Sequence, residues 1–298
     1  MDLSVIIVNH KTAHLLEQCI NTIVAKYPEL VGNFVIVDNT PTPKTSAHIK
    51  KIFPKERYIP SRKNVGFAKA INWGITNTST KYILTVNTDV IIRDDAISKL
   101  YDYLDTHRDV AMVAPQLIYK DGTIQDSCCR FYSPKIMVYR RTFLGKFDRP
   151  KKALADHVME DYDHKSTKDV DWVVGAAMMI RRQAIDDIGL MDERYFLYLE
   201  DVDWCRRFWE NGWRVVYYPE AKMTHYHARE SAEQYGFLSI FNKLTRIHIK
   251  SGIKYFWKYR GRKKSPRKLY KEAIEKKKHE RKRNSSNLSS PKEQTQAA

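Results

Sequence analysis

The sequence contains no apolar run long enough to cross a membrane. The best such run, Trp172–Ile180, is far shorter than the about 20 residues that a spanning helix needs. Near the N-terminus, Leu3–Val8 is too short for the apolar core of a signal peptide, and no basic segment precedes it. We therefore expect neither a spanning helix nor a secretory leader.

Cysteine is scarce and follows no pattern. The four residues are Cys19, Cys128, Cys129 and Cys205, and no two of them form a CxxC pair. Adjacent cysteines rarely bridge each other, because the ring that they would close is strained. This usage favours a reduced, cytoplasmic protein.

The region around the first expected strand lacks a glycine-rich, lysine-containing loop of the kind that cradles phosphates. Nucleotidyltransferases place an acidic metal site beside a parallel sheet. The absence of a phosphate-binding loop argues against this class of enzyme. The chain also has no internal repeats.

What is present fits a folded protein with a strongly basic end. The chain has 298 residues, of which 43% are hydrophobic and 12% aromatic, enough for one sizeable α/β domain with an appendage. Its formal net charge is +17, and fifteen Lys and Arg against three Glu between Lys254 and Arg283 account for most of it. Such a segment suits an anionic membrane surface or nucleic acid.

The first third of the chain alternates strands and helices, which predicts an α/β fold with an open, mostly parallel sheet. The expected strands are Leu3–Val8, Phe34–Val37 and Tyr82–Val86, and the expected helices are 14–24, one entered from 64–75, and 94–104. In such sheets ligands bind beyond the carboxyl ends of the strands. The polar residues at that edge are Asn9, Asp38, Asn39, and the run Asn87-Thr88-Asp89.

The remainder of the chain is less regular. The expected elements are a loop region near a site over 131–168, an apolar segment over 170–181, helices over 182–188 and 200–210, a strand over 215–218, and one or two amphipathic helices between 231 and 258. From residue 284 the Ser, Asn, Gln and Pro content predicts a disordered tail.

Two acidic positions and one histidine could carry chemistry. Asp89 ends an apolar strand, where a carboxylate could hold a divalent cation or simply cap the following turn. Glu200 and Asp201 follow an aromatic run, where burial would raise a carboxyl pKa towards that of a general base. Acids at a helix N-terminus would also meet the helix dipole favourably. A lone histidine such as His225 is, taken by itself, more often structural than functional.

Two arginines follow the acidic pair. Arg206 and Arg207 could neutralise a diphosphate group. Asp203 and Arg207 also have the i, i+4 spacing of an ordinary helical ion pair. Both roles stay open at this point.

Taken together, these stretches resemble a known family. The segments are SVIIVNHKTAHLLEQCINTI, FVIVDNT, NVGFAKAIN, YILTVNTDV, DWVVGAAMMIRR and GLMDERYFLYLEDVDWCRRFWENGWRVVYYPEAKMTH, in that order. Covering about residues 3–230, they resemble the family-2 inverting glycosyltransferases of the GT-A fold, particularly the bacterial rhamnosyltransferase branch. The last segment is the most specific, because a long match with the acidic pair inside it rarely arises by chance.

The resemblance implies a binding site for a nucleotide sugar and a divalent cation, Mg²⁺ or Mn²⁺. Asp89 matches the last residue of the DxD-like motif and is expected to bind the cation, with His225, or its neighbour His227, completing the site. Asn87 stands at the first position of that motif, where Asp would bind metal more strongly. The expected nucleotide-sugar-binding residues are Asn9, Asp38, Asn39, Asn64, Gly66, Asn87 and Arg207.

The resemblance also implies a catalytic centre. Asp201 matches the catalytic base, with Glu200 beside it, and would take the proton of an acceptor hydroxyl as this attacks the anomeric carbon. A single displacement of this kind inverts the anomeric centre. Trp172, Gly175 and Ala176 are expected to line the acceptor and sugar pocket.

The implied substrates are a dTDP-deoxysugar such as rhamnose, with a UDP-hexose as the alternative, and a saccharide or lipid-linked acceptor in cell-surface polysaccharide biosynthesis. We expect a peripheral position at the inner face of the plasma membrane through the basic segment 254–283, helped by Ile253, Tyr255, Phe256, Trp257 and Tyr259. A nucleic-acid-binding protein is the rival class, but it leaves Asp89, Asp201 and His225 without a purpose. A catalytically silent scaffold is a further rival, against which the intact acidic pair argues.

The expected division of the chain is a GT-A catalytic domain over 1–230, a basic helical extension over 231–283, and a tail over 284–298. Within the catalytic domain, the nucleotide-binding half covers about 1–120 and the acceptor half about 121–230.

Overall fold

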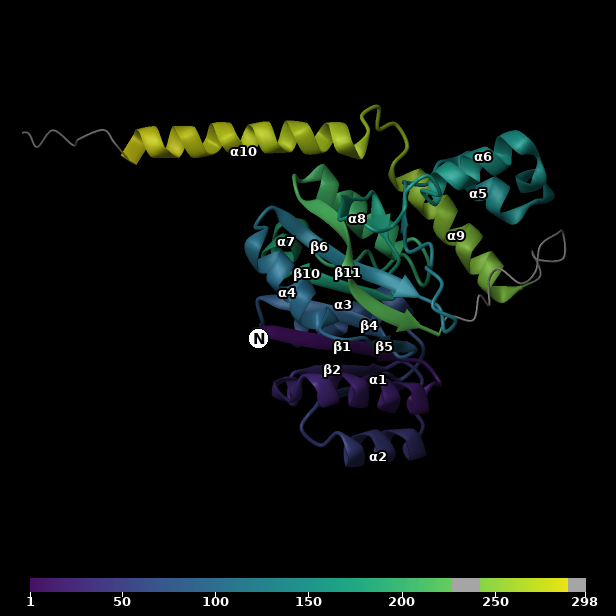
Figure 1. The fold of residues 1–298 in the computed structure, drawn as a ribbon, viewed down its shortest axis with the longest axis vertical. Helices are drawn as coiled ribbons and strands as arrows, with labels where there is room; N and C mark the ends of the chain where they lie inside the picture. Colours follow the sequence, from purple (N-terminus) through teal and green to yellow (C-terminus); the bar gives the residue numbers. More distant parts are fainter. Residues whose placement is uncertain (227–241, 289–298) are drawn as a thin grey trace, which may run out of the picture.

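The computed structural model describes residues 1–226 and 242–288 (Figure 1). His227, the alternative to His225 as a cation ligand, lies outside the described residues.

A nine-stranded sheet forms the centre of the described part of the chain. Its strands are β1 (Leu3–Asn9), β2 (Phe34–Asp38), β3 (Arg57–Pro60), β4 (Tyr82–Asn87), β5 (Val90–Ile92), β6 (Val110–Ile118), β8 (Lys168–Asp169), β10 (Ala177–Arg181) and β11 (Arg214–His225). A small separate sheet pairs β7 (Cys128–Cys129) with β9 (Trp172–Val173).

The sheet is mixed rather than mostly parallel. Its spatial order is β3-β2-β1-β4-β10-β6-β11-β5, with β8 beside β11. Strands β3, β2, β1 and β4 are parallel, whereas β10 runs antiparallel to both β4 and β6. The α/β fold is therefore confirmed, and the parallel arrangement holds for the N-terminal half of the sheet.

Helices cover both faces of the sheet. They are α1 (Ala13–Lys26), α2 (Pro43–Ile52), α3 (Phe67–Thr76), α4 (Ala96–Thr106), α5 (Pro134–Arg141), α6 (Asp148–His157), α7 (Arg182–Ile188), α8 (Glu200–Glu210), α9 (Lys243–Lys258) and α10 (Pro266–Leu288), with short 3₁₀ helices η1 (Pro28–Leu30) and η2 (Phe143–Lys146). Leu3, Val5 and Ile7 of β1 pack in the core under α1 and α4, and Ile6 packs in the core under α3 and α8. Because successive strand residues point to opposite faces, an uninterrupted apolar strand serves both cores.

Residues 131–168, expected to be a loop region, contain helices α5 and α6. The side chain of Ser133 accepts a hydrogen bond from the backbone N–H of Ile136, and Pro134 occupies the first turn of α5. The two helices bury few of their own side chains, so their apolar periodicity is weak. The expectation was wrong because capping and packing against neighbours, rather than an apolar stripe, define this hairpin.

Helix α9 belongs to the protein core, which changes the role of two residues assigned to a membrane anchor. Tyr255 is fully buried and Tyr259 nearly so, whereas Ile253 and Trp257 are 64% and 67% exposed. In Figure 1, α9 lies beside α8 and the α5–α6 hairpin, and α10 extends across one end of the molecule. Only the exposed residues of α9 are available to a partner.

Among the helices within residues 1–226 and 242–288, none combines the length and the apolar composition that crossing a bilayer requires.

Asp203, which has no exposed surface, ties α9 to α8. Its Oδ1 accepts hydrogen bonds from Lys258 Nζ at 2.5 Å and from the Tyr259 hydroxyl at 2.8 Å. Its Oδ2 accepts from Arg207 Nε at 2.9 Å. These charge-assisted hydrogen bonds to a buried carboxylate hold α8 and α9 together, because removing the carboxylate would leave buried charges without a partner.

We expect Asp203→Ala to lower the free energy of unfolding by about 3–5 kcal/mol, because Lys258 and Arg207 would lose a buried counter-charge. Urea denaturation followed by circular dichroism measures the change. The matched control is Asp156→Ala, which removes an exposed ion pair with Arg130 and should cost about 0–1 kcal/mol. Equal losses of unfolding free energy in the two variants would contradict a stabilising role of Asp203 between α8 and α9.

Candidate functional site

The carboxyl ends of β2, β1 and β4 meet at one edge of the sheet. Asn9 lies opposite Asp38 in the β1–β2 register, and Val8 lies opposite Asn87 in the β1–β4 register. The polar residues that follow these strands are therefore neighbours, as the strand order required.

Asp38 is buried and orders the loop after β2. Its Oδ1 accepts hydrogen bonds from Asn9 Nδ2 at 3.0 Å and from the Thr40 N–H at 3.2 Å, and its Oδ2 accepts from the Tyr58 hydroxyl at 2.8 Å. Burial, followed by contact with Asp38, raises the pKa of Tyr58 to about 12, so the phenol remains a donor. Both oxygens of Asp38 already have partners, so this residue fixes the conformation of the backbone and side chains at this edge of the sheet.

Asn39, Asn64 and Gly66 connect two loops of the same edge. Asn39 Nδ2 donates to Asn64 Oδ1 at 3.0 Å, and the Gly66 N–H donates to the same oxygen at 2.9 Å. Gly66 has φ of +89°, and a Cβ there would lie 2.4 Å from the carbonyl oxygen of Phe196. The Phe67 N–H also donates to that carbonyl at 2.8 Å. Glycine at this position therefore lets the 64–66 loop pack directly against the segment that precedes α8.

Asp89 and His225 face each other next to β5. His225 Nε2 lies 3.4 Å from Asp89 Oδ2. The Nδ1–H of His225 donates to Gln125 Oε1 at 3.0 Å, and Gln125 Nε2 donates back to the His225 carbonyl at 2.9 Å. This double contact orients the ring so that Nε2 is directed at the carboxylate, because Gln125 Oε1 accepts a hydrogen bond from the N–H at Nδ1.

Sequence reasoning missed Gln125. It lies in a polar segment after β6 with no motif around it, so only the three-dimensional contact with His225 reveals its role.

Asp201 lies in the first turn of α8 and is held by backbone groups. Its Oδ2 accepts from the Gly175 N–H at 3.1 Å, and its Oδ1 accepts from the Val202 N–H at 2.8 Å. Tyr198 and Leu199, just before the helix, both have positive φ, at 69° and 68°. Consecutive non-glycine residues in this conformation are strained, and such strain is common where a side chain must be aimed at a site.

Glu200 and Asp201 differ in their ionisation. Burial raises the pKa of Asp201 to about 6, against the lowering effect of the Val202 and Gly175 N–H groups. Burial, and then the charge of Asp201, raises the pKa of Glu200 well above its usual range. Glu200 Oε2 is buried without a hydrogen-bond partner within the described part of the chain. Burial thus disfavours the charged form of both carboxyl groups, and because the charge of Asp201 adds to this effect at Glu200, the negative charge of the pair is favoured on Asp201.

A short backbone path connects the two acidic positions. The Asn87 N–H donates to the Ala176 carbonyl at 2.8 Å, and the adjacent Gly175 holds Asp201. Asp89 follows two residues after Asn87. The backbone two residues before Asp89 and the side chain of Asp201 thus contact the neighbouring residues Ala176 and Gly175, although the two acids are 112 residues apart in sequence.

Arg207 requires a correction. Its Nε bonds to Asp203, and its other two guanidinium nitrogens donate to the carbonyls of Ile188 and Leu190, at 2.9 and 2.7 Å. Between its two open roles, the structure favours the helical ion pair, and we no longer assign Arg207 to a diphosphate. Its guanidinium caps the end of α7 instead.

The expected acceptor-pocket residues also divide. Trp172 is buried, and its Nε1 donates to the Arg130 carbonyl at 2.8 Å. Ala176, the residue before β10, is buried. Its carbonyl accepts the hydrogen bond from the Asn87 N–H. Of the three, Gly175 is the one whose N–H contacts Asp201.

Comparisons with known proteins show the family of the chain. The family described as Glycosyl transferase family 2 matches residues 4–189. The N-acetylglucosaminyl-diphospho-decaprenol L-rhamnosyltransferase of Mycobacterium tuberculosis is 25% identical over 236 residues, which cover 75% of this chain and 76% of that protein. The dTDP-rhamnosyl transferase RfbF of Shigella flexneri is 26% identical over 210 residues, which cover 69% of this chain and 64% of that protein.

The fold is shared with solved glycosyltransferases. The mannosyltransferase PcManGT from Pyrobaculum calidifontis, solved in complex with GDP-Man and Mn2+, superposes with a TM-score of 0.57 at 15% identity, covering 91% of this chain and 69% of that one. At this identity the likeness concerns the fold.

The ionisation of Asp201 can be measured without any ligand. In a ¹³C NMR titration of protein labelled at its aspartate carboxyls, we expect one signal to titrate near pH 6, because burial disfavours the charged carboxylate. Asp201→Asn should remove that signal and leave the others in place. If the signal that disappears in the variant titrates near pH 4, the site does not raise the pKa of Asp201.

Proposed function

The chain belongs to glycosyl transferase family 2, and on that premise we propose that it transfers a deoxysugar, rhamnose or a close relative, from a dTDP donor to a saccharide or lipid-linked saccharide acceptor with inversion at the anomeric carbon. The observation that carries this proposal is the Asp201 carboxylate, with its pKa raised to about 6, held beside the residues that lead to Asp89. An ionised base next to a cation-binding edge is what an inverting transfer needs.

The choice of donor is supported by the relatives. The Shigella flexneri protein is named for a dTDP-rhamnosyl donor, and the Mycobacterium tuberculosis protein for an L-rhamnosyl transfer to a diphospho-decaprenol acceptor. A UDP-hexose remains the alternative donor within the same fold. A thermal-shift panel of nucleotide sugars would rank them, with dTDP-rhamnose expected to give the largest rise.

In this proposal Asp201 accepts the proton of the acceptor hydroxyl as its oxygen attacks the anomeric carbon. The Gly175 and Val202 N–H groups fix the carboxylate for that transfer. Burial and the charge of Asp201 raise the pKa of the neighbouring Glu200, which disfavours a second negative charge next to the base. One displacement completes the reaction, so no covalent bond forms between sugar and protein.

Asp89 and His225 fit a divalent cation, Mg²⁺ or Mn²⁺. A carboxylate oxygen and an imidazole nitrogen directed at each other across 3.4 Å offer two ligands, and Gln125 fixes the tautomer that such a ligand needs. Among the described residues, no third His, Cys, Asp or Glu joins them, which suits an ion that also uses water and substrate phosphate. When bound, such an ion supplies positive charge to the departing diphosphate.

The nucleotide would lie over the β2–β1–β4 edge. We propose that Asn9, Asp38 and Asn39 form the floor, with Asn64 and Gly66 on one side and Asn87 on the other. The hydrogen bonds among them are made before any ligand arrives, which lowers the entropic cost of binding.

Two substitutions should separate binding from chemistry. We expect Asp201→Asn to lower kcat by about 10²–10⁴-fold, because the amide cannot accept the proton, while binding dTDP-rhamnose normally. Asp89→Ala should instead weaken donor binding in the presence of Mn²⁺ and leave metal-free binding unchanged. Isothermal titration with and without Mn²⁺, together with a transfer assay, measures both.

The control for these two variants is Asp95→Asn, an exposed aspartate at the start of α4, which should match the wild type in both assays. Near-wild-type turnover by Asp201→Asn would overturn the assignment of the base. Unchanged Mn²⁺-dependent binding by Asp89→Ala would overturn the cation site.

We also propose that residues 1–230 carry both substrate sites and that the extension over 231–283 brings them to the inner face of the plasma membrane. On α9, Ile253 and Trp257 are exposed, and the guanidinium of Arg260 stacks 3.4 Å from the Trp257 ring centroid. Exposed lysines continue along α10. An aromatic residue beside several basic ones favours the headgroup region of an anionic bilayer.

Reversing the charge of three lysines on one side of α10, with Lys268→Glu, Lys271→Glu and Lys278→Glu together, should abolish flotation with phosphatidylglycerol vesicles, since each lysine near such a surface contributes up to about 1 kcal/mol. The matched control is Lys44→Glu, Lys51→Glu and Lys55→Glu at the opposite end of the molecule, around α2 (Figure 1). Loss of flotation in both triple variants would indicate a general charge effect and contradict a docking role for α10.

A further inference from the structure

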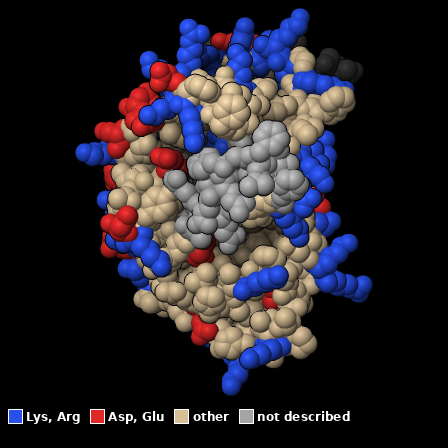
Figure 2. Space-filling model, turned by 90° about the vertical axis from the view of Figure 1, so that its right-hand side faces the viewer, with Lys and Arg blue, Asp and Glu red and all other residues tan. Residues whose placement is uncertain are grey.

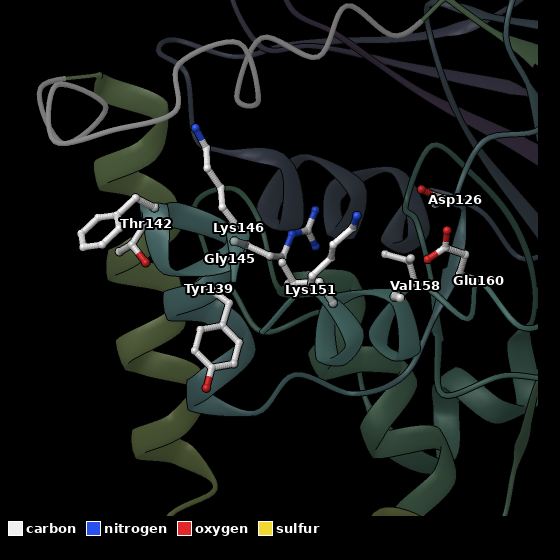
Figure 3. A pocket seen from close by; sticks show the side chains of 12 residues that line it. Asp126, Tyr139, Thr142, Gly145, Lys146, Lys151, Val158 and Glu160 are labelled. Carbon is white, nitrogen blue, oxygen red and sulfur yellow. The ribbon is translucent and has the colours of Figure 1, made fainter. Parts of the chain in front are cut away.

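A cavity of about 590 Å³ lies beside the α5–η2–α6 hairpin (Figure 3). Its volume is in the range of small-molecule and cofactor sites. The residues that matter for its chemistry are Asp126, Phe143, Lys146, Lys151, Leu154 and Glu160. None of these belongs to the donor site described above.

The cavity adjoins the candidate catalytic centre through Asp126. The residue that follows it, Ser127, accepts a hydrogen bond at its carbonyl from the Val174 N–H at 2.9 Å. The next N–H along that segment, that of Gly175, bonds to the Asp201 carboxylate. A molecule in the cavity therefore has one end towards the segment that holds Asp201, which suits an acceptor, whereas the nucleotide would lie over the β2–β1–β4 edge.

The polar lining changes along the cavity. Figure 3 shows Thr142 at one end, Lys146 and Lys151 in the middle with their amines on the same side of the hairpin, and Asp126 and Glu160 at the other end. Carboxylates accept hydrogen bonds from sugar hydroxyls, and lysine ammonium groups bind phosphates as point charges.

Lys146 and Lys151 have no carboxylate at ion-pair distance within the described residues, whereas Lys258 on α9 pairs with both Asp192 and Asp203. Two ammonium groups on one wall of a cavity favour a ligand that carries at least two negative charges. A diphosphate meets that requirement.

The end of the cavity beyond the lysines is apolar and open to solvent. Phe143 lines this end and is 61% exposed. Phe147, 58% exposed, lies just outside the lining, and its ring centroid is 6.3 Å from that of Phe143 in an edge-to-face arrangement. Large exposed aromatic pairs are uncommon on soluble surfaces and mark contacts with apolar partners. Figure 2 shows basic side chains around uncharged surface at the upper end of this face, where Figure 1 places α5 and α6.

We propose that this cavity binds the diphosphate of an isoprenyl-linked acceptor, with Lys146 and Lys151 on the phosphates, Phe143 and Phe147 on the first isoprene units, and Asp126 and Glu160 on the sugar. The order of these groups matches the order of sugar, diphosphate and lipid in such a molecule. The inference rests on the proposed function, because it gives the lipid-linked acceptor of that reaction its place.

The probe is farnesyl diphosphate, titrated into the full-length chain by calorimetry below its aggregation concentration. We expect Lys146→Ala/Lys151→Ala to weaken binding about 10-fold or more, since two charge-assisted contacts are lost. The matched control is Arg149→Ala/Lys152→Ala, which removes the same charge from exposed positions of α6 outside the lining and should change the affinity less than 3-fold.

Two further ligands distinguish the parts of the site. Phe143→Ser/Phe147→Ser should weaken farnesyl diphosphate and leave inorganic diphosphate unchanged, and farnesol should bind the wild type far more weakly than farnesyl diphosphate. Equal losses in the two basic double variants would overturn the proposal. So would wild-type binding of farnesol as tight as that of farnesyl diphosphate.

A parallel titration with dTDP-rhamnose separates this inference from the proposed function. A chain that binds the nucleotide sugar but not farnesyl diphosphate overturns the acceptor subsite alone. A chain that binds farnesyl diphosphate through Lys146 and Lys151 but no nucleotide sugar supports the subsite and overturns the proposed donor.

Discussion

The Gly175 N–H bond to the Asp201 carboxylate joins the two parts of the site. Gly175 lies just before β10, whose neighbour β4 leads to Asp89, and Asp201 lies at the start of α8. Through this one contact the start of α8, with Asp201, is fixed against the segment that pairs with β4. Burial of Asp201 at this position also raises its pKa, because burial disfavours the charged carboxylate.

Helix α8 in turn depends on the C-terminal part of the chain. Asp203 accepts hydrogen bonds from Lys258 of α9 and from Tyr259, the residue after it. The fully buried Tyr255 of α9 belongs to the same core cluster as the apolar residues of α8. Helix α9 also meets the α5–α6 hairpin, because a Cβ at Gly252 would lie 3.0 Å from Met137 Cε. The basic extension is thus part of the support for α8, and only the side chains of α9 and α10 that stay exposed are available to a partner.

Much of the N-terminal half could be predicted from sequence, because strands buried on both faces are apolar throughout and end in polar residues. The α/β class and strands β1, β2 and β4 follow from such patterns, and the expected helices 182–188 and 200–210 match α7 and α8 farther along the chain. The hairpin of α5 and α6 could not, since its helices bury few side chains, and α2 was missed because its Thr42 cap and Pro43 resemble a turn. The tail aromatics were assigned together, although only burial distinguishes Tyr255 and Tyr259 from Trp257. Gln125 carries no sequence pattern at all.

The central claim is that Asp89 and Asp201 serve one cation–diphosphate centre. Crystals grown with dTDP and Mn²⁺ test it directly through the anomalous scattering of manganese. The account predicts a single strong peak within about 2.0–2.3 Å of an Asp89 oxygen and the His225 Nε2. The manganese should contact the diphosphate, and the Asp201 carboxylate should face this metal–diphosphate site. A manganese peak bound elsewhere, or a diphosphate that lies out of reach of Asp201, would contradict it.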